Sequence, residues 1–169
     1  MDQQDQQDQQ DSSTTTYMIT SPAVGTIEVS GEAIMRFREP IWGFPDRTEY
    51  ALLPAARQGI WWLLSVQEPH TTFVLADPFV GRADYGIDLG DSERDALQID
   101  APTDALALVM VALPMMPTEA VTANLRAPIV FNISKGLAQQ VVNRDENYSL
   151  REPIDLTAYP AQDDGVRLA

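Results

Sequence analysis

Few residues in this sequence could perform acid–base or nucleophilic chemistry. The chain has no cysteine and a single histidine, His70, which directly follows Pro69 in what reads as a turn between strands. It contains no glycine-rich phosphate loop, no Cys/His metal spacing and no nucleophile elbow. A hydrolytic triad would need the imidazole of His70, and we expect that residue to be an exposed turn histidine instead. We therefore predict a protein that is not an enzyme and has no catalytic residue, cofactor or metal ion.

The acidic run DYGIDLGDSERD has the composition of a calcium-binding loop but not its register. When Asp84, Asp88 and Asp95 are aligned with the first, fifth and twelfth positions of an EF-hand loop, Leu89 falls where the sharp-turn glycine belongs. The third position would be Gly86, which has no ligand side chain. Capping of a nearby helix explains these carboxylates better than calcium does.

The strongest signal in the composition is the formal net charge of -14, from 11 Lys and Arg against 25 Asp and Glu. This balance argues against direct binding to nucleic acid, where neutralised phosphates supply the affinity. Such a field attracts basic partners, although acidity also serves solubility alone. The longest apolar run, residues 105–117, is broken by two prolines, and no signal peptide is visible. We expect no membrane association and, with no cysteine present, a cytoplasmic location.

The elements begin after a low-complexity leader. Residues 1–16, MDQQDQQDQQDSSTTT, have no apolar side chain after Met1, so we expect a disordered Gln/Asp-rich tail. From Tyr17 onward, short β-branched and aromatic runs alternate with turn signals. Strands are predicted within residues 18–30 (as a hairpin), 33–37, 48–54, 60–67, 71–79, 104–114, 127–132 and 137–143.

Within IWWLLSVQ the period of two places Trp61 and Leu63 on one face and Trp62 and Leu64 on the other. Both faces are apolar, which predicts a central strand. One short helix is expected over DSERDALQI, with Asp91 or Ser92 as its N-cap. These elements predict a mainly β protein, a small antiparallel β-barrel-like domain with one short helix. Residues 155–169 are expected to form an irregular C-terminal tail.

Several short motifs match a known family in order. They are GTIEV, PIWGFPDRTEYALLP, LLSVQEP, FVLADPF, DYGIDLGD, LQI, TANLRAPIVFN, QQVV and YSLREPI. The chain resembles the flagellar assembly factor FliW family from about residue 17 to residue 154, and TANLRAPIVFN, ADPF and the loop at Gly43-Phe44 are its most specific parts. One departure is that Ala138 and Gln139 stand where the family usually has a basic residue.

The resemblance implies a small antiparallel β-barrel-like domain over residues 17–154, without enzymatic activity, that is cytoplasmic and monomeric when free. It also implies two protein partners. One is CsrA, a basic RNA-binding regulator that represses translation of flagellin messenger RNA, and the other is flagellin. In the implied partner switch, flagellin occupies this protein and frees CsrA, and secretion of flagellin lets this protein capture CsrA again. The family is associated with non-competitive inhibition beside the RNA surface, although direct masking stays open.

Two loops are candidate partner surfaces. The predicted partner-binding residues are Asp77, Pro78, Phe79, Tyr85, Asn124 and Arg126. The alternative for Asn124 and Arg126 is that they only hold their loop together. Apolar side chains of the following strand, Ile129 and Phe131 or else Val130, should build the barrel.

Two other functions stay open. One is a flagellin-binding chaperone that ignores CsrA. The other is a barrel that binds a small ligand in a pocket lined by Trp61 or Trp62. A further open point is the pair Met115-Met116, which suits either a partner surface or core filling.

Overall fold

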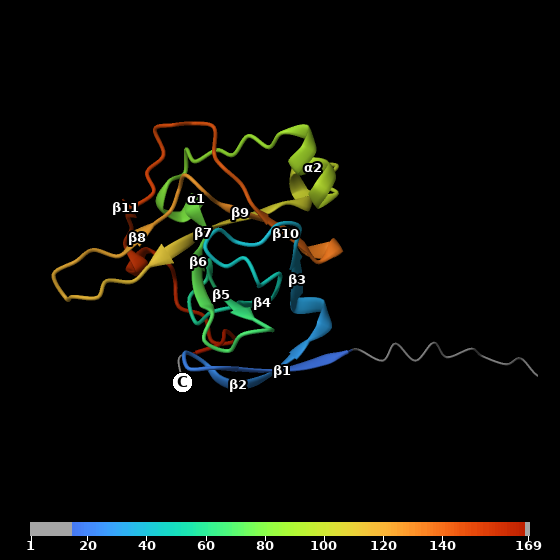
Figure 1. Ribbon diagram of the computed structural model, residues 1–169. Coiled ribbons are helices and arrows are strands. Elements are labelled where there is room, and N and C mark those ends of the chain that lie inside the picture. The colour runs from blue at the N-terminus through green and yellow to red at the C-terminus, as the bar shows by residue number, and fades with distance from the viewer. Residues whose placement is uncertain (1–14, 168–169) are drawn as a thin grey trace, which may run out of the picture.

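The computed structural model describes residues 15–167 (Figure 1). The strands are β1 Thr16–Ser21, β2 Gly25–Ser30, β3 Ile34–Phe37, β4 Glu49–Pro54, β5 Ile60–Ser65, β6 Thr72–Ala76, β7 Leu106–Ala112, β8 Thr122–Ala123, β9 Ile129–Asn132, β10 Leu137–Gln140 and β11 Glu152–Pro153. The α-helices are α1 Pro78–Gly81 and α2 Asp91–Leu97, and single 3-10 turns are η1 Gly31–Ala33, η2 Pro102–Asp104, η3 Ile133–Lys135 and η4 Leu156–Ala158. The predicted mainly β class is confirmed.

The larger sheet closes into a barrel. Its strand order is β11-β8-β7-β6-β5-β4-β3-β10-β9, and an additional pairing of β7 with β9 completes the ring. In that closing pair Leu108 lies opposite Ile129 and Leu106 opposite Phe131. The neighbours are antiparallel, as predicted, except that β10 runs parallel to β3. Closure removes the open edges that a flat sheet of these strands would expose.

The barrel wall separates two apolar layers because successive side chains of a strand point to opposite faces. Leu63 of β5 lies in the interior cluster, with Trp61 packed against it, whereas Trp62 and Leu64 belong to the outer cluster. This is the alternation that the sequence predicts for β5. The interior cluster consists of Met35, Phe37, Ile41, Tyr50, Leu52, Leu63, Leu75, Leu108, Ile129, Phe131 and Ala138.

The predicted β1–β2 hairpin packs on the outside of this wall. Thr16 pairs with Ser30 and Ser21 with Gly25 across a two-stranded antiparallel sheet. Its inward residues Ile19 and Val29 join the outer cluster. The barrel is therefore covered on this side by a segment that is far from β5 and β6 in the chain.

The expected N-terminal tail, residues 1–16, lies outside the described residues except for its last two, and β1 already begins at Thr16. Residues 155–167 have little regular structure beyond η4, but they pack closely on the barrel. Tyr159 is buried, and its carbonyl oxygen accepts a hydrogen bond from Arg57 Nη1 at 2.9 Å. Trp62 Nε1 donates to the carbonyl oxygen of Val166 at 3.0 Å. This segment is therefore part of the packed structure of the domain.

Two short helices lie between β6 and β7, where the sequence predicted one. The predicted helix is α2, but its N-cap is Gly90, so the assignment of Asp91 or Ser92 as cap is wrong. The Glu93 carboxylate reaches back to accept a hydrogen bond from the Gly90 N–H at 2.6 Å, which removes the need for a capping side chain one residue later. The helix ends at Leu97, and its C-cap, Gln98, has a left-handed backbone conformation with φ 54°. The missed helix, α1, is a single turn that is too short to produce a helical period.

Candidate partner-binding site

The residues that could perform chemistry are scattered. Within residues 15–167, no group of three or more His, Asp or Glu side chains is placed to hold a metal ion. His70 is exposed in the turn between β5 and β6, as predicted. Asp84 pairs with Arg82 at 3.1 Å, and this guanidinium holds the pKa of the Asp84 carboxyl below its ordinary value. In the part of the chain described, no helix is long and apolar enough to cross a membrane.

Asp77 and Pro78 build the start of α1. The Asp77 carboxylate accepts a hydrogen bond from the Phe79 N–H at 2.9 Å, and Pro78 occupies the first helical turn, where a missing N–H costs nothing. The backbone of Asp77 is also bonded on both sides, to Gly59 at 2.7 Å and to the Tyr159 hydroxyl at 2.8 Å. Pro78 is buried. These two residues fix the position of the loop that follows them.

Tyr85 is buried in the structure, although the sequence suggested a contact residue. Its hydroxyl donates to the Leu125 carbonyl oxygen at 2.8 Å, and burial raises the pKa of Tyr85 to about 12. Its ring contacts Phe79 and Tyr148, with centroids 5.6 Å and 4.7 Å away. Tyr85 therefore joins the two predicted surfaces into one, because Leu125 lies within the second loop.

Asn124 and Arg126 both make contacts within their own neighbourhood. The Asn124 side-chain oxygen accepts a hydrogen bond from the Ala127 N–H at 3.0 Å, which closes a turn. Arg126 Nη2 lies 3.8 Å from Glu146 Oε1, and the Arg126 side chain is 28% exposed. These contacts account for the loop-holding role, while a direct role in partner binding stays a prediction for both residues.

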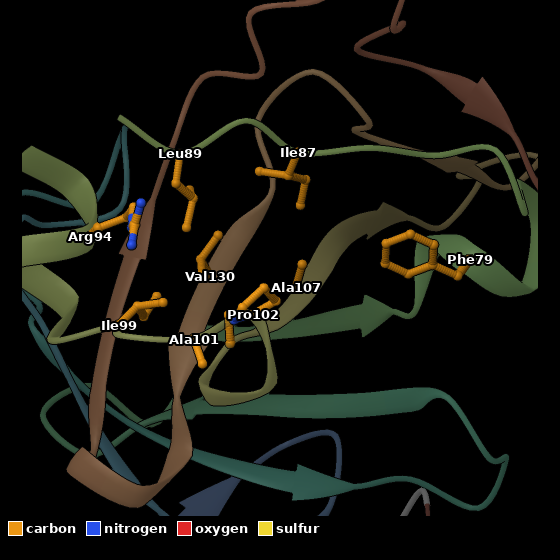
Figure 2. A pocket seen from close by; sticks show the side chains of 10 residues that line it. Phe79, Ile87, Leu89, Arg94, Ile99, Ala101, Pro102, Ala107 and Val130 are labelled. Carbon is orange, nitrogen blue, oxygen red and sulfur yellow. The ribbon is translucent and has the colours of Figure 1, made fainter. Parts of the chain in front are cut away.

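Phe79 differs from the other five predicted residues because it is an exposed residue, with 47% of its surface accessible. It stands at one end of an apolar groove of about 570 Å³, and Arg94 stands at the other end (Figure 2). We call this hollow the Phe79–Arg94 groove. Its lining residues are Phe79, Ile87, Leu89, Arg94, Ile99, Ala101, Pro102, Ala105, Ala107 and Val130.

The sequence analysis did not predict this groove, although some of its lining residues follow a recognisable pattern in the sequence. Ile87 and Leu89 are alternating apolar residues in an acidic loop, and this alternation is the local signal that could have pointed to the groove. Val130 turns away from the barrel interior, as its neighbours Ile129 and Phe131 predict, and packs with Leu97 and the rest of a third apolar cluster. The groove lies over that cluster, where strands β7 and β9 meet.

The groove has a charged rim. Four exposed carboxylates belong to residues that are close in the chain to lining residues: Asp88 lies between Ile87 and Leu89, Asp100 between Ile99 and Ala101, and Asp91 and Asp95 lie on α2 with Arg94. Asp88 lies 3.5 Å from Arg144, and both side chains are largely exposed, so this pair neutralises little. The guanidinium of Arg94 makes no ion pair within 4.0 Å among the described residues. An apolar floor with an acidic border suits a protein surface better than a small polar ligand.

The exposure of the tryptophans and of the Met pair answers two further expectations from the sequence. Trp62 is 8% exposed and covered by the C-terminal segment, and Trp61 packs against the interior cluster, so neither lines the groove. The Met pair lies on the long loop between β7 and β8, which projects from the barrel (Figure 1). Met115 is 96% exposed and Met116 59%, so the core-filling alternative is wrong.

The whole barrel matches proteins of one family. The family model described as FliW protein matches residues 18–154. A flagellar assembly factor FliW from Geobacillus thermodenitrificans is 38% identical over 130 residues, which covers 77% of this chain and 90% of that relative. Another from Pseudothermotoga lettingae is 33% identical over 137 residues, which covers 81% of this chain and 88% of the relative. A crystal structure of the flagellar assembly factor FliW superimposes with a TM-score of 0.72 at 34% identity, covering 80% of this chain and 95% of that one.

Proposed function

The chain belongs to the FliW family of flagellar assembly factors, and from this membership we propose that it binds and antagonises the translational regulator CsrA and is itself sequestered by flagellin. The observation that carries the proposal is the match of the family model to residues 18–154, which include both loops of the candidate site and the whole Phe79–Arg94 groove. As a partner switch it acts in the cytoplasm, without cofactor or catalysis, and as a monomer when free.

The charge of the chain supports a basic partner. A protein that binds RNA carries basic surface, and a chain with formal net charge -14 steers such a surface towards itself at low ionic strength. The same charge, held beside the path of the RNA, repels phosphate. Charge therefore supports inhibition beside the RNA surface and direct masking of that surface equally.

The candidate site supports protein binding through its architecture. Tyr85 and Asn124 hold two loops in fixed positions, and Phe79 projects from one of them as a half-exposed aromatic ring. Rigid loops that present an exposed aromatic side chain are typical of binding surfaces, because little ordering is lost when the partner arrives. This arrangement supports Phe79 as the contact residue among the six predicted positions.

The decisive experiment is titration calorimetry against CsrA from the same organism, repeated with flagellin present. Binding to CsrA that flagellin abolishes is the expected result. Binding to flagellin alone would replace the switch by a flagellin chaperone, the second candidate function. Adding a saturating RNA ligand of CsrA separates the two inhibitory routes, since direct masking predicts that RNA and this protein exclude each other.

The role of Phe79 is tested by Phe79→Ala, with Met18→Ala as the matched control. Met18 is 67% exposed and lies on β1, in the hairpin at the other end of the molecule (Figure 1). We expect Phe79→Ala to weaken partner binding and Met18→Ala to leave it unchanged, with equal unfolding midpoints for both variants. Equal affinities for the two variants would remove Phe79 from the site.

A further inference from the structure

We propose that the acidic part of the leader, residues 2–11, binds a basic strip on the barrel of the same molecule. The strip consists of Arg36 and Lys135, which line a hollow between β3 and the η3 turn, and of Arg38, the next outward-facing residue after Arg36. This contact lies within one chain, so it is independent of the partners named under the proposed function.

Three of the 11 basic residues of the chain gather in this strip. Arg36 and Arg38 flank the buried Phe37, so both side chains point to the outer side of β3. The Arg36 N–H donates to the carbonyl oxygen of Gly136 at 2.8 Å, where β3 meets β10 (Figure 1), and this bond brings the neighbouring Lys135 beside Arg36. The hollow that Arg36 and Lys135 line has a volume of about 460 Å³.

Most of the positive charge of the strip has no carboxylate partner nearby. Arg38 and Lys135 make no ion pair within 4.0 Å among residues 15–167. Arg36 Nε lies 3.3 Å from Glu49 Oε1, and 70% of the Arg36 side chain is exposed, so water screens this pair strongly. Glu32 also lines the hollow and weakens the positive field there. The strip can therefore still attract a carboxylate, and Glu32 opposes that attraction.

The leader joins the described structure at the rim of this hollow. The Gly31 N–H donates to the carbonyl oxygen of Thr15 at 2.7 Å, and Gly31 and Tyr17 are both lining residues. Asp11 lies four residues before Thr15, so at roughly 3.5 Å per residue it can reach about 14 Å from that point. A tether of this length holds a carboxylate near the strip at an effective concentration on the order of millimolar. Weak contacts are therefore sufficient for binding.

The leader has the charge that the strip requires. Its four ionisable side chains are Asp2, Asp5, Asp8 and Asp11, which repeat every third residue with glutamines between them. One exposed ion pair contributes little, but four carboxylates on one tether can replace one another at the strip. The leader of a second copy is a poorer occupant, because two chains of formal net charge -14 repel each other. The bound leader would give this face the same sign of charge as the rest of the chain.

Spin labelling tests the contact directly, because the chain has no cysteine and accepts a single engineered one. Gln7→Cys carries a nitroxide in the middle of the leader, and the broadening of backbone amide NMR signals shows which residues it approaches. The matched control is the same labelled chain with its four leader aspartates changed to asparagine, since its length and point of attachment are identical. At low salt we expect the signals of Arg38 and Lys135 to be broadened about twofold more by the acidic leader than by the control.

Equal broadening by the two leaders would mean that the label only samples the space around Thr15, and would overturn the proposal. Raising the salt concentration should bring the acidic leader to the level of the control, because screening weakens exposed pairs. Broadening that does not change with salt would overturn the ionic contact.

Variants of the strip locate the contact on the barrel. The double variant Arg38→Gln, Lys135→Gln should lose the extra broadening, and both side chains are exposed, so we expect its unfolding midpoint to match wild type. Glu32→Gln removes the opposing charge from the hollow and should increase the broadening. Undiminished broadening in the double variant would mean that the leader binds elsewhere and would overturn the assignment of the strip.

Discussion

The buried hydroxyl of Tyr85 lies 2.8 Å from the carbonyl oxygen of Leu125, 40 residues along the chain, and so ties the loop after α1 to the loop before β9. Each loop was a separate candidate surface in the sequence. The bond makes them parts of one surface, with Phe79 exposed beside it and the Phe79–Arg94 groove next to it. Residues that hold this surface and residues that touch a partner should therefore respond differently to mutation.

The first prediction compares two buried tyrosines. Tyr85→Phe should lower the free energy of unfolding by about 1–2 kcal/mol, because the Leu125 carbonyl loses its buried donor. Tyr50→Phe should change it by about 0.5 kcal/mol or less, or stabilise, because among the described residues the Tyr50 hydroxyl is buried without a hydrogen-bond partner. Urea unfolding measures both, and equal losses would mean that the Tyr85 bond contributes no more than the ring.

A second prediction concerns alkaline pH. Burial raises the pKa of both Tyr50 and Tyr85 to about 12, whereas a tyrosine in the unfolded chain titrates near 10. Below about pH 10 their contribution is fully present. Between about pH 10 and pH 12 the unfolded chain loses these protons first, so the free energy of unfolding should fall as pH rises.

Urea midpoints measured across this range provide the check, with tyrosinate absorbance to follow ionisation. Tyr50→Phe should flatten the profile relative to wild type. A profile that is the same in wild type and Tyr50→Phe would contradict the raised pKa of that residue.

Asn124 allows its two roles to be separated. Asn124→Ala should lower the free energy of unfolding by about 1–2 kcal/mol, because the buried N–H of Ala127 loses its acceptor. Asn124→Asp keeps an acceptor oxygen and should retain most of the stability. Differential scanning calorimetry measures both changes. Unchanged stability in Asn124→Ala combined with weaker partner binding would instead identify Asn124 as a direct contact.

The C-terminal segment should be required for stability. Deleting residues 155–169 uncovers Trp62 and removes the buried ring of Tyr159, so we expect a loss of about 3 kcal/mol or more and a red shift of tryptophan emission. Tyr159→Phe, which removes only the bond to the Asp77 carbonyl, should cost about 1 kcal/mol. A truncated protein with wild-type unfolding and emission would show that the packing of this segment is energetically neutral.

The N-terminal leader should act through charge. Deleting residues 2–14 removes Asp2, Asp5, Asp8 and Asp11, four of the charges that make up the formal -14, and leaves -10. The association rate with a basic partner should fall at low salt and match wild type at high salt, where the screening length is short.

Stopped-flow mixing across a salt series measures this rate. A full-length variant with the four Asp residues changed to Asn is the control, and it should reproduce the deletion. A defect that persists at high salt would indicate direct contact by the leader rather than steering.

The sequence by itself determined the local elements and the family. The apolar alternation of β5 is visible residue by residue, because the period of two depends only on the pleat of the strand, and the structure places Leu63 and Trp62 on the predicted faces. The β1–β2 hairpin likewise follows from neighbouring residues. The order of the family motifs was also readable, because it needs no spatial information.

The tertiary structure alone decided which distant segments meet. β3 pairs in parallel with β10, and β7 pairs with β9 to close the barrel. The apolar pattern within one strand does not indicate which other strand it pairs with. Tyr85 was predicted as a contact residue of the loop that follows Asp77, and it is buried because Leu125 and Tyr148 contact it from later in the chain. The Phe79–Arg94 groove has the same origin, since its walls come from three segments and its hollow exists only when they are assembled. Burial is a property of the assembled contacts, whereas periodicity is a property of one strand.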